Sequence, residues 1–331
     1  MKPTSAVIAV TYRCNSRCET CDIWKRDATP ELRPADFGRL PAGLRNINIS
    51  GGEPFLRDDL VEIIEVLREN YPNASVVIST NGLIPDRIEK YVRKMGRVGV
   101  RVSIDAIGTL NDKVRGVKGA FTLATETLDR LQTLGLKDLG ISATISRHTA
   151  GDLKKLKEMA DSRGIEFVTS LVHSSPTYFG EHEDELPVKG SPEGEVIQKE
   201  LIWLRDREIS STRPKDWFRA YLTAGIVEQL QGKRRRIKCY AGSCLFFMEP
   251  AGDVYPCNIW PERMGNILLQ SYDEMMAKSG RILAEVDVCP FQCWMSCTVA
   301  PVMRKRPLNP ALWVALRKLG VSDRHEDSSD K

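Results

Sequence analysis

Histidine is scarce in this chain of 331 residues, with four copies, and the net charge is only +4. No apolar run approaches the roughly 20 residues that a membrane-spanning helix needs. The apolar run at residues 6–10 is too short for the core of a signal peptide. The small net charge argues against nucleic acid as the main partner. These absences predict a cytoplasmic protein without a nucleic-acid partner, and its composition, 42% hydrophobic and 28% charged, is ordinary.

Cysteine is missing from the long stretch between residues 22 and 238, and all nine copies lie on either side of it. The first group is Cys14, Cys18 and Cys21. The second group contains the other six, which are Cys239, Cys244, Cys257, Cys289, Cys293 and Cys297. In a reducing compartment such groups indicate metal or catalytic sites rather than disulfides. Because histidine is scarce, the ligands would be mostly thiolates, which favour zinc or iron–sulfur clusters.

The first half of the chain alternates short β-branched runs with amphipathic helical patterns. The expected strands are residues 6–12, 46–50, 75–79, 99–104, 140–146 and 165–172. Between them, the pattern at 59–69 places apolar residues on one face of a helix. Gly135 and Gly164 stand where helices are expected to stop. Six βα units predict an α/β fold with a parallel sheet and helices outside it, either an open doubly wound sheet or a complete or partial barrel.

The second half is expected to be more irregular. Residues 174–195 are typical of a loop, 195–232 of helices, and 248–257 of a hairpin that turns at 250–253. The boundaries we expect are a barrel at 1–190, a helical linker at 191–238, a small cysteine-rich β-hairpin and helix domain at 239–300, and a basic C-terminal helix with its tail at 301–331. The last ten residues are mostly polar, which predicts disorder.

Unusual sequences directly follow four of the expected strands. The first strand leads into the cysteine triplet, the second into Gly51-Gly52-Glu53-Pro54, and the third, which ends at Ser79, into Thr80-Asn81-Gly82. Ser103 and Asp105 stand at the end of the fourth. In parallel βα folds the C-terminal ends of the strands form the rim where ligands bind. The four motifs therefore predict a single site.

The chemistry of this site follows from its residue types. Three closely spaced cysteines cannot close a structural zinc site, which needs four ligands. On a [4Fe–4S] cube they leave one iron open, which can chelate an amine and a carboxylate such as those of S-adenosylmethionine (SAM). The carbonyls of Gly51 and Gly52 can accept hydrogen bonds from that amine, and Glu53 offers a further acceptor. The alternative is a zinc site with a distant fourth ligand.

Three further polar residues are candidates for the same cofactor. Ser103 and Asp105 can hold ribose hydroxyls or the SAM carboxylate region, or they can serve as strand-end caps. Arg115, in the expected loop before the next helix, can pair with a carboxylate or be a solvated surface residue.

Together these motifs resemble the signature of the radical SAM superfamily, and the resemblance covers nearly the whole chain. It implies a partial (β/α)6 TIM-like barrel with a [4Fe–4S] cluster on the first three cysteines. It also implies one-electron cleavage of SAM to methionine and a 5′-deoxyadenosyl radical, which abstracts a hydrogen atom from substrate. The electron would come from a donor such as flavodoxin or ferredoxin. Thr20 departs from the aromatic residue usual before the third cysteine, although its backbone can still meet the adenine edge.

The second cysteine group is similar to the SPASM/twitch domain of many radical SAM enzymes. The resemblance rests on the Cys239-x4-Cys244-x12-Cys257 spacing, with Gly252 five positions before Cys257. It implies one or two auxiliary [4Fe–4S] clusters. Two cubes would need eight cysteines, so one cluster and two spare thiols is the simplest count. The family spacing favours Cys239, Cys244, Cys257 and Cys297 as ligands, with Cys293 able to replace one of them. A zinc knuckle is the alternative.

The sequence says less about the substrate. His173, Ser175 and Tyr178 follow the sixth strand and are candidates to face it. The chain begins at its first strand, which lowers the expectation of a ribosomal peptide, so a small molecule, a sugar or glycan, a lipid-linked precursor and a peptide all stay open. An auxiliary cluster would suit a net oxidation, such as a dehydrogenation or a crosslink. A spare thiol that donates hydrogen would suit epimerisation. A non-catalytic zinc or iron–sulfur protein is the rival from another class.

The C-terminal segment offers one more partner. Residues 310–319 have a helical pattern, with Leu312, Leu316 and Leu319 on one side and the basic pair Arg317 and Lys318 near the end. Such a helix can lie on an anionic membrane surface. It can equally pack on the domain and leave a solvated basic face.

Overall fold

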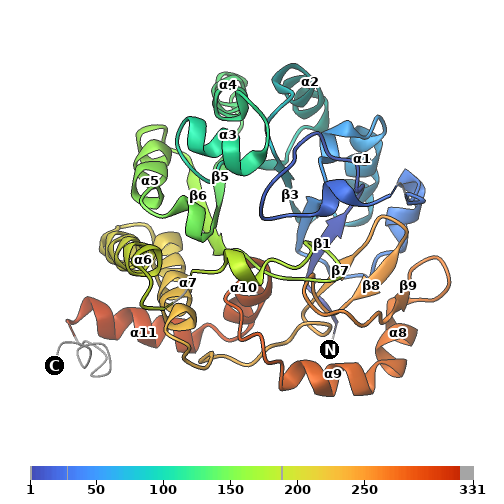
Figure 1. Cartoon of the computed structure of the whole chain (residues 1–331). Coiled ribbons are helices and arrows are strands. Elements are labelled where there is room, and N and C mark those ends of the chain that lie inside the picture. Colours follow the sequence, from blue (N-terminus) through green and yellow to red (C-terminus); the bar gives the residue numbers. More distant parts are fainter. Residues whose placement is uncertain (1, 28, 188, 321–331) are drawn as a thin grey trace.

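The computed structural model describes residues 2–27, 29–187 and 189–320. Six parallel strands stand side by side in chain order and form a barrel that is open on one side (Figure 1). They are β1 (Ser5–Ala9), β2 (Asn46–Ser50), β3 (Ser75–Thr80), β4 (Gly99–Ser103), β5 (Asp138–Ile145) and β6 (Glu166–Leu171). The helices outside them are α1 (Leu60–Asn70), α2 (Pro85–Met95), α3 (Thr109–Arg115), α4 (Ala120–Thr133) and α5 (Leu153–Ser162). The predicted partial (β/α)6 barrel is confirmed.

In β2, β5 and β6, apolar and polar residues largely alternate, because successive side chains of a strand point to opposite sides. In β2, Ile47 and Ile49 are buried in the main apolar core. Asn46, Asn48 and Ser50 alternate with them and line cavities inside the barrel. Full (β/α)8 barrels fill this space with bulky branched side chains. The small polar residues here leave room for ligands instead.

The second half of the chain closes the open side of the barrel. The helices are α6 (Pro192–Ser210), α7 (Pro214–Leu230), α8 (Tyr272–Lys278), α9 (Gly280–Asp287), α10 (Ser296–Lys305) and α11 (Leu308–Lys318), and the strands are β7 (Leu245–Met248), β8 (Asp253–Tyr255) and β9 (Gly265–Asn266). Figure 1 shows α10 between α7 and β7, and α10 packs against β6. Five short 3-10 turns lie at 23–25, 34–39, 54–56, 147–149 and 183–185.

The sheet continues without a break into the cysteine-rich region. β7 pairs in parallel with β1, with Ser5 opposite Leu245 and Ile8 opposite Met248. β8 and β9 then extend the sheet in antiparallel fashion, which gives the order β6-β5-β4-β3-β2-β1-β7-β8-β9. The predicted hairpin is present, with Phe247 opposite Tyr255. The expected domain boundary near residue 239 therefore divides a continuous sheet, and the division into four regions stays a prediction.

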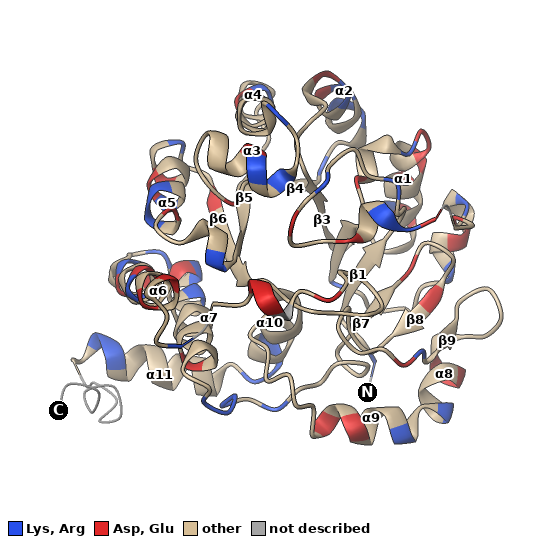
Figure 2. Cartoon of the chain, in the orientation of Figure 1, with Lys and Arg blue, Asp and Glu red and all other residues tan. Residues whose placement is uncertain are grey.

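The outer surface carries both signs of charge. Figure 2 shows acidic and basic residues mixed over the outer helices. The last helix, α11, packs on α7 through buried Trp313 and leaves Leu312, Leu316 and Leu319 exposed. Within the described ranges, no helix combines the length and apolarity that crossing a bilayer requires. The prediction for the last ten residues lies outside the described residues.

Candidate active site

The three N-terminal thiols lie around one pocket at the C-terminal ends of the strands. Cys14, Cys18 and Cys21 all line this cavity of about 180 Å³, which we call the upper pocket. The loop that carries them is fastened to the end of α3, because the backbone N–H of Arg17 donates to the Arg115 carbonyl at 2.9 Å. The Ser16 hydroxyl also donates to the Arg115 carbonyl, at 2.8 Å. The triplet is thus held in place by the barrel.

Gly51 and Gly52 line the upper pocket and bring β2 against the cysteine loop. The N–H of Gly52 donates to the Thr11 carbonyl at 2.8 Å. A Cβ atom on Gly51 would lie 2.3 Å from the Thr11 carbonyl oxygen, and one on Gly52 would lie 2.2 Å from that of Arg13. Gly51 also has a φ of +130°, which disfavours any side chain. Glycine is therefore required at both positions because the backbone lies directly against the cysteine loop as well as beside the pocket.

Glu53 is fully buried and does not line the upper pocket. Its carboxylate accepts hydrogen bonds from the N–H of Phe55 at 3.1 Å, the hydroxyl of Thr80 at 2.9 Å and the N–H of Asn81 at 2.7 Å. Burial raises its pKa to about 7, although these hydrogen bonds oppose the rise. The carboxylate therefore joins the end of β2 to the end of β3. Its contact with a SAM amine stays a prediction, as does any contact of buried Pro54.

Arg115 and Asp105 form an ion pair inside the protein. Their charged groups lie 2.9 Å apart, and the Asp105 carboxylate also accepts the N–H of Thr144 at 2.7 Å. The Arg115 guanidinium is 3.7 Å from the Cys18 sulfur and lines the upper pocket. We expected Arg115 in a loop, but it is the last residue of α3, and its side chain is buried rather than solvated. It places a positive charge beside the cysteine triplet.

The remaining predicted cofactor residues lie where the motif order placed them. Thr20, Ser79, Asn81 and Ser103 all line the upper pocket. The Asn81 amide donates to the Asn15 side chain at 2.7 Å, which fixes its orientation beside the cysteine loop. The Ser79 hydroxyl donates to the Asn48 side chain at 3.1 Å.

The three substrate candidates have different surroundings. His173 lines the upper pocket, its Nδ1 hydrogen-bonds to the Leu171 carbonyl at 2.5 Å, and its buried Nε2 has no partner among the described residues. Burial lowers its pKa to about 4, so the ring is neutral. Tyr178 also lines the pocket, and its hydroxyl lies 3.1 Å from that of Ser50. Ser175 does not line it, because its hydroxyl donates to the Asn258 carbonyl at 2.7 Å.

The chemistry of the thiols fits a metal cluster. Burial raises the pKa of Cys14 to about 11 and that of Cys21 to about 12. Without a metal these cysteines would stay protonated. The positive charge of bound iron stabilises the thiolate form and so converts such thiols into ligands. Among the described residues, no three side chains of histidine, cysteine, aspartate or glutamate form a ready-made site for a single metal ion.

Five of the six C-terminal cysteines lie near one another. Cys289 is one of them, since burial and the nearby Cys293 and Cys239 raise its pKa. Cys239, Cys257 and Cys293 belong to one buried apolar cluster, and Cys297 packs against it. Cys244 has different surroundings, since its pKa responds to burial first and then to Lys305. The structure thus groups Cys293 with three of the four favoured ligands. Cys297 and Cys21 both pack against a second apolar cluster, so Cys297 lies on the side of its group that faces the N-terminal cysteines.

Sequence reasoning missed several residues of the upper pocket. Ser50, Thr144 and Ser170 line it from the ends of β2, β5 and β6, and Met295 reaches it from the cysteine-rich region. The signal for the first three was the alternation of polar and apolar residues within the strands. For Met295 no local signal exists, because its position depends on how the second half packs across the barrel.

The comparison with family models decides the identity. The model described as the Radical SAM superfamily matches residues 8–162, which contain the cysteine triplet and the glycine motif. Residues 8–162 of this chain are a radical SAM domain. The family implies a [4Fe–4S] cluster with SAM, and Cys14, Cys18 and Cys21 are the thiols placed to hold it.

Proteins of known name are similar to this chain in sequence or in fold. This chain is 35% identical over 164 residues to the Fe-coproporphyrin III synthase of Methanosarcina barkeri. That alignment covers 47% of this chain and 40% of the synthase. The chain is 27% identical over 310 residues to the pre-heme d1 synthase of Dinoroseobacter shibae. That alignment covers 84% of this chain and 74% of the synthase. The fold matches SAM-bound Streptococcus suis SuiB with a TM-score of 0.63 and 15% identity, over 86% of this chain and 67% of that one.

Proposed function

We propose that this radical SAM protein is an oxidoreductase that removes a hydrogen atom from an unactivated C–H bond of its substrate. The observation that carries the proposal is the composition of the upper pocket, where the three thiols, the glycine backbone and the polar strand ends meet. When bound, the cluster supplies the electron that cleaves SAM to methionine and a 5′-deoxyadenosyl radical. The electron reaches it from a donor such as flavodoxin or ferredoxin in the cytoplasm.

The residues of this chain have three tasks in that reaction. Cys14, Cys18 and Cys21 hold the cluster, and Gly51 and Gly52 keep the backbone close enough to shape the SAM site. Trp24 and Met295 line the same pocket and help to exclude water from the radical.

We further propose an auxiliary [4Fe–4S] cluster of the SPASM/twitch type in the second cysteine group. The ligands we favour are now Cys239, Cys257, Cys293 and Cys297, because these four share one apolar cluster. Such a cluster can accept the second electron of a net oxidation. The alternative is redox-neutral epimerisation with a cysteine as hydrogen donor. Cys297 is the thiol that favours this alternative, because it lines a cavity inside the barrel.

The substrate we favour is a small molecule. The two relatives compared above are named for the synthesis of Fe-coproporphyrin III and pre-heme d1, both tetrapyrroles. Sugars, lipid-linked precursors and peptides are the other classes. A lipid-linked substrate would go with peripheral membrane contact through α11, whose leucines are exposed.

The test is an anaerobic assay of SAM cleavage. The full chain is reconstituted with iron and sulfide, given dithionite and SAM, and analysed for 5′-deoxyadenosine. Formation in the wild type and in the control Cys244→Ala, but not in Cys18→Ala, is the expected result. Equal formation in the wild type and Cys18→Ala would contradict the proposal, and absence of iron uptake would favour zinc. Product lighter by two hydrogens would indicate oxidation, whereas solvent deuterium in an unoxidised product would indicate epimerisation.

A further inference from the structure

A second and larger cavity lies inside the barrel below the upper pocket. It has a volume of about 550 Å³, within the range of small-molecule sites, and we call it the lower chamber. Ser5, Asn46 and Ser75, the first residues of β1, β2 and β3, line it, so it reaches the N-terminal ends of the strands. Ser79 lines both this chamber and the upper pocket. The two cavities therefore lie on either side of Ser79.

The walls of the chamber come from both halves of the chain. One face of α7 supplies Lys215, Phe218 and Arg219, and one face of α10 supplies Cys297 and Arg304, among others. The strands contribute small polar side chains and Arg101 from their inner faces. Much of the remaining lining is apolar, including Val7, Val77 and Leu222, so the cavity suits a molecule with an apolar body and a few polar or charged groups.

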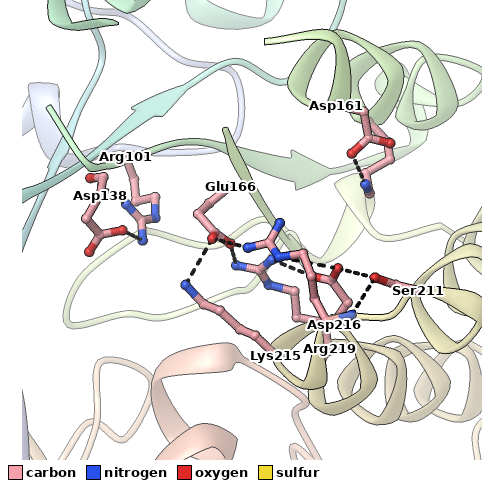
Figure 3. Close-up of polar contacts among 10 residues, drawn as sticks. Arg101, Asp138, Asp161, Glu166, Ser211, Lys215, Asp216 and Arg219 are labelled. Atoms are coloured by element: carbon pink, nitrogen blue, oxygen red, sulfur yellow. Dashed lines mark hydrogen bonds and ion pairs between the residues drawn. The ribbon is translucent and has the colours of Figure 1, made fainter. Parts of the chain in front are cut away.

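Most charged groups at the lower end are already paired. Arg101 lies 2.6 Å from Asp138, and Glu166 contacts both Arg219 and, at 3.3 Å, Lys215 (Figure 3). Arg213 also binds Glu166, at 2.6 Å, and Arg219 also binds Asp216, at 3.1 Å. Around Glu166, three cations thus meet two carboxylates, which leaves an excess of positive charge.

Arg304 is the cation of the chamber that lacks a partner. Across the ranges that the structure describes, it makes no ion pair or hydrogen bond with another residue, and Arg101, Lys215 and Arg219 all do. Guanidinium groups bind carboxylates and phosphates in a fixed two-pronged geometry. Arg304 is exposed to solvent where it borders the chamber, and its unpaired guanidinium is suited to an anionic group of a ligand that reaches this end.

We propose that the lower chamber holds the substrate and that Arg304 binds an anionic group on it, a carboxylate or a phosphate. The inference rests on the proposed function, since the rest of the substrate would extend past Ser79 to the radical formed in the upper pocket. It specifies the substrate as a small molecule with at least one acidic group.

The test measures anion binding without SAM. Thermal unfolding of the full chain is followed at low ionic strength while inorganic phosphate, or in a separate arm glutarate, is added. The variants are Arg304→Gln and the matched control Arg306→Gln, which removes the same charge two residues further along and does not line the chamber. The anion concentration for half-maximal stabilisation should rise at least tenfold in Arg304→Gln and stay unchanged in Arg306→Gln. The arm with the lower half-maximal concentration identifies the preferred anion.

A second variant tests whether the anion lies inside the chamber. Ala300 lines the chamber from α10, so Ala300→Phe fills space there without changing charge. It should abolish the stabilisation by the anion, and Ala300→Leu serves if the larger side chain prevents folding. Equal weakening in Arg304→Gln and Arg306→Gln, or unchanged binding in the filled variant, would overturn the inference.

The SAM-cleavage assay separates this inference from the proposed function. Anion binding that depends on Arg304, in a chain that makes no 5′-deoxyadenosine, would support the chamber and contradict the radical chemistry. Cleavage of SAM dependent on Cys18, with anion binding indifferent to Arg304, would support the chemistry and contradict the chamber assignment.

Discussion

The two cysteine groups of this protein differ in how they meet their surroundings. The N-terminal three lie on one loop, are partly accessible and line the upper pocket. The C-terminal group is spread over the segments that flank the β7–β8 hairpin, the segment before α10 and the first turn of α10, and four of its six thiols are buried. A compact triplet at a pocket suits a cluster that binds a small molecule. A buried, dispersed set suits a cluster that only exchanges electrons.

Each group also has its own arginine. Arg115 lies beside Cys18 and is neutralised by Asp105. Arg235 donates to the carbonyls of Ile237 and Cys293, and its pKa also responds to Cys239. In the part of the chain that the structure describes, no carboxylate pairs with Arg235. The two clusters would therefore experience different local charge.

The largest effect on stability should come from removing the charge of Arg115. Arg115→Met leaves the Asp105 carboxylate buried without its partner, which costs about 3–5 kcal/mol of unfolding free energy. The double variant with Asp105→Asn should recover most of that loss. Urea unfolding of the iron-free chain measures both, and no recovery in the double variant would show that the ion pair is not the cause.

Substitution of Gly52 should disable the N-terminal group without removing a thiol. Gly52→Ala drives a methyl group into the Arg13 carbonyl, so the cysteine loop must shift and 5′-deoxyadenosine formation should fall by roughly 100-fold. Gly280→Ala, at a position with open space around its added Cβ, is the control and should keep full activity. Equal activity of the two variants would mean that the loop tolerates the displacement.

The cysteine variants of the second group should separate ligands from bystanders. Cys293→Ala should lower the iron content from about eight to about four per chain, the content of one cube, and Cys244→Ala should leave it unchanged. Iron and sulfide analysis after reconstitution gives the answer. The reverse pattern would restore Cys244 to the ligand set.

The smallest effect should be a shift in potential. A positive guanidinium near a cluster favours its reduced form, so Arg235→Gln should lower the midpoint potential of the C-terminal cluster alone. An electron paramagnetic resonance redox titration, with Arg236→Gln as the control, measures the shift. An upward shift would contradict the assignment of this arginine to the second group.

Local patterns in the sequence were sufficient to predict the barrel. All six expected strands are present, with ends within three residues of the prediction, because β-branched runs between amphipathic helices reflect local packing. The expectation that motifs following parallel strands meet at one rim also led to Thr20, Asn81 and Ser103, which line one pocket. These features depend on residues close in sequence or on a topology that all such folds share.

Contacts distant in sequence were not predictable in the same way. The pairing of β7 with β1, the ion pair of Arg115 with Asp105 and the engagement of Ser175 by Asn258 each depend on how separate segments meet. The lower chamber was missed for another reason. Its signal was the polar side of each strand, visible in Asn46 and Asn48, but its walls come from α7 and α10 across the open side.

The parallel pairing of β1 with β7 has a consequence for biosynthesis. β1 leaves the ribosome long before β7, one of its two neighbours, which follows some 240 residues later. Until then the strand that carries the cysteine loop presents a free edge, which favours aggregation. The support of the cysteine loop is therefore complete only after synthesis has passed β7. A fragment that ends at residue 190 would keep all three N-terminal cysteines and still lack one side of the strand that supports them.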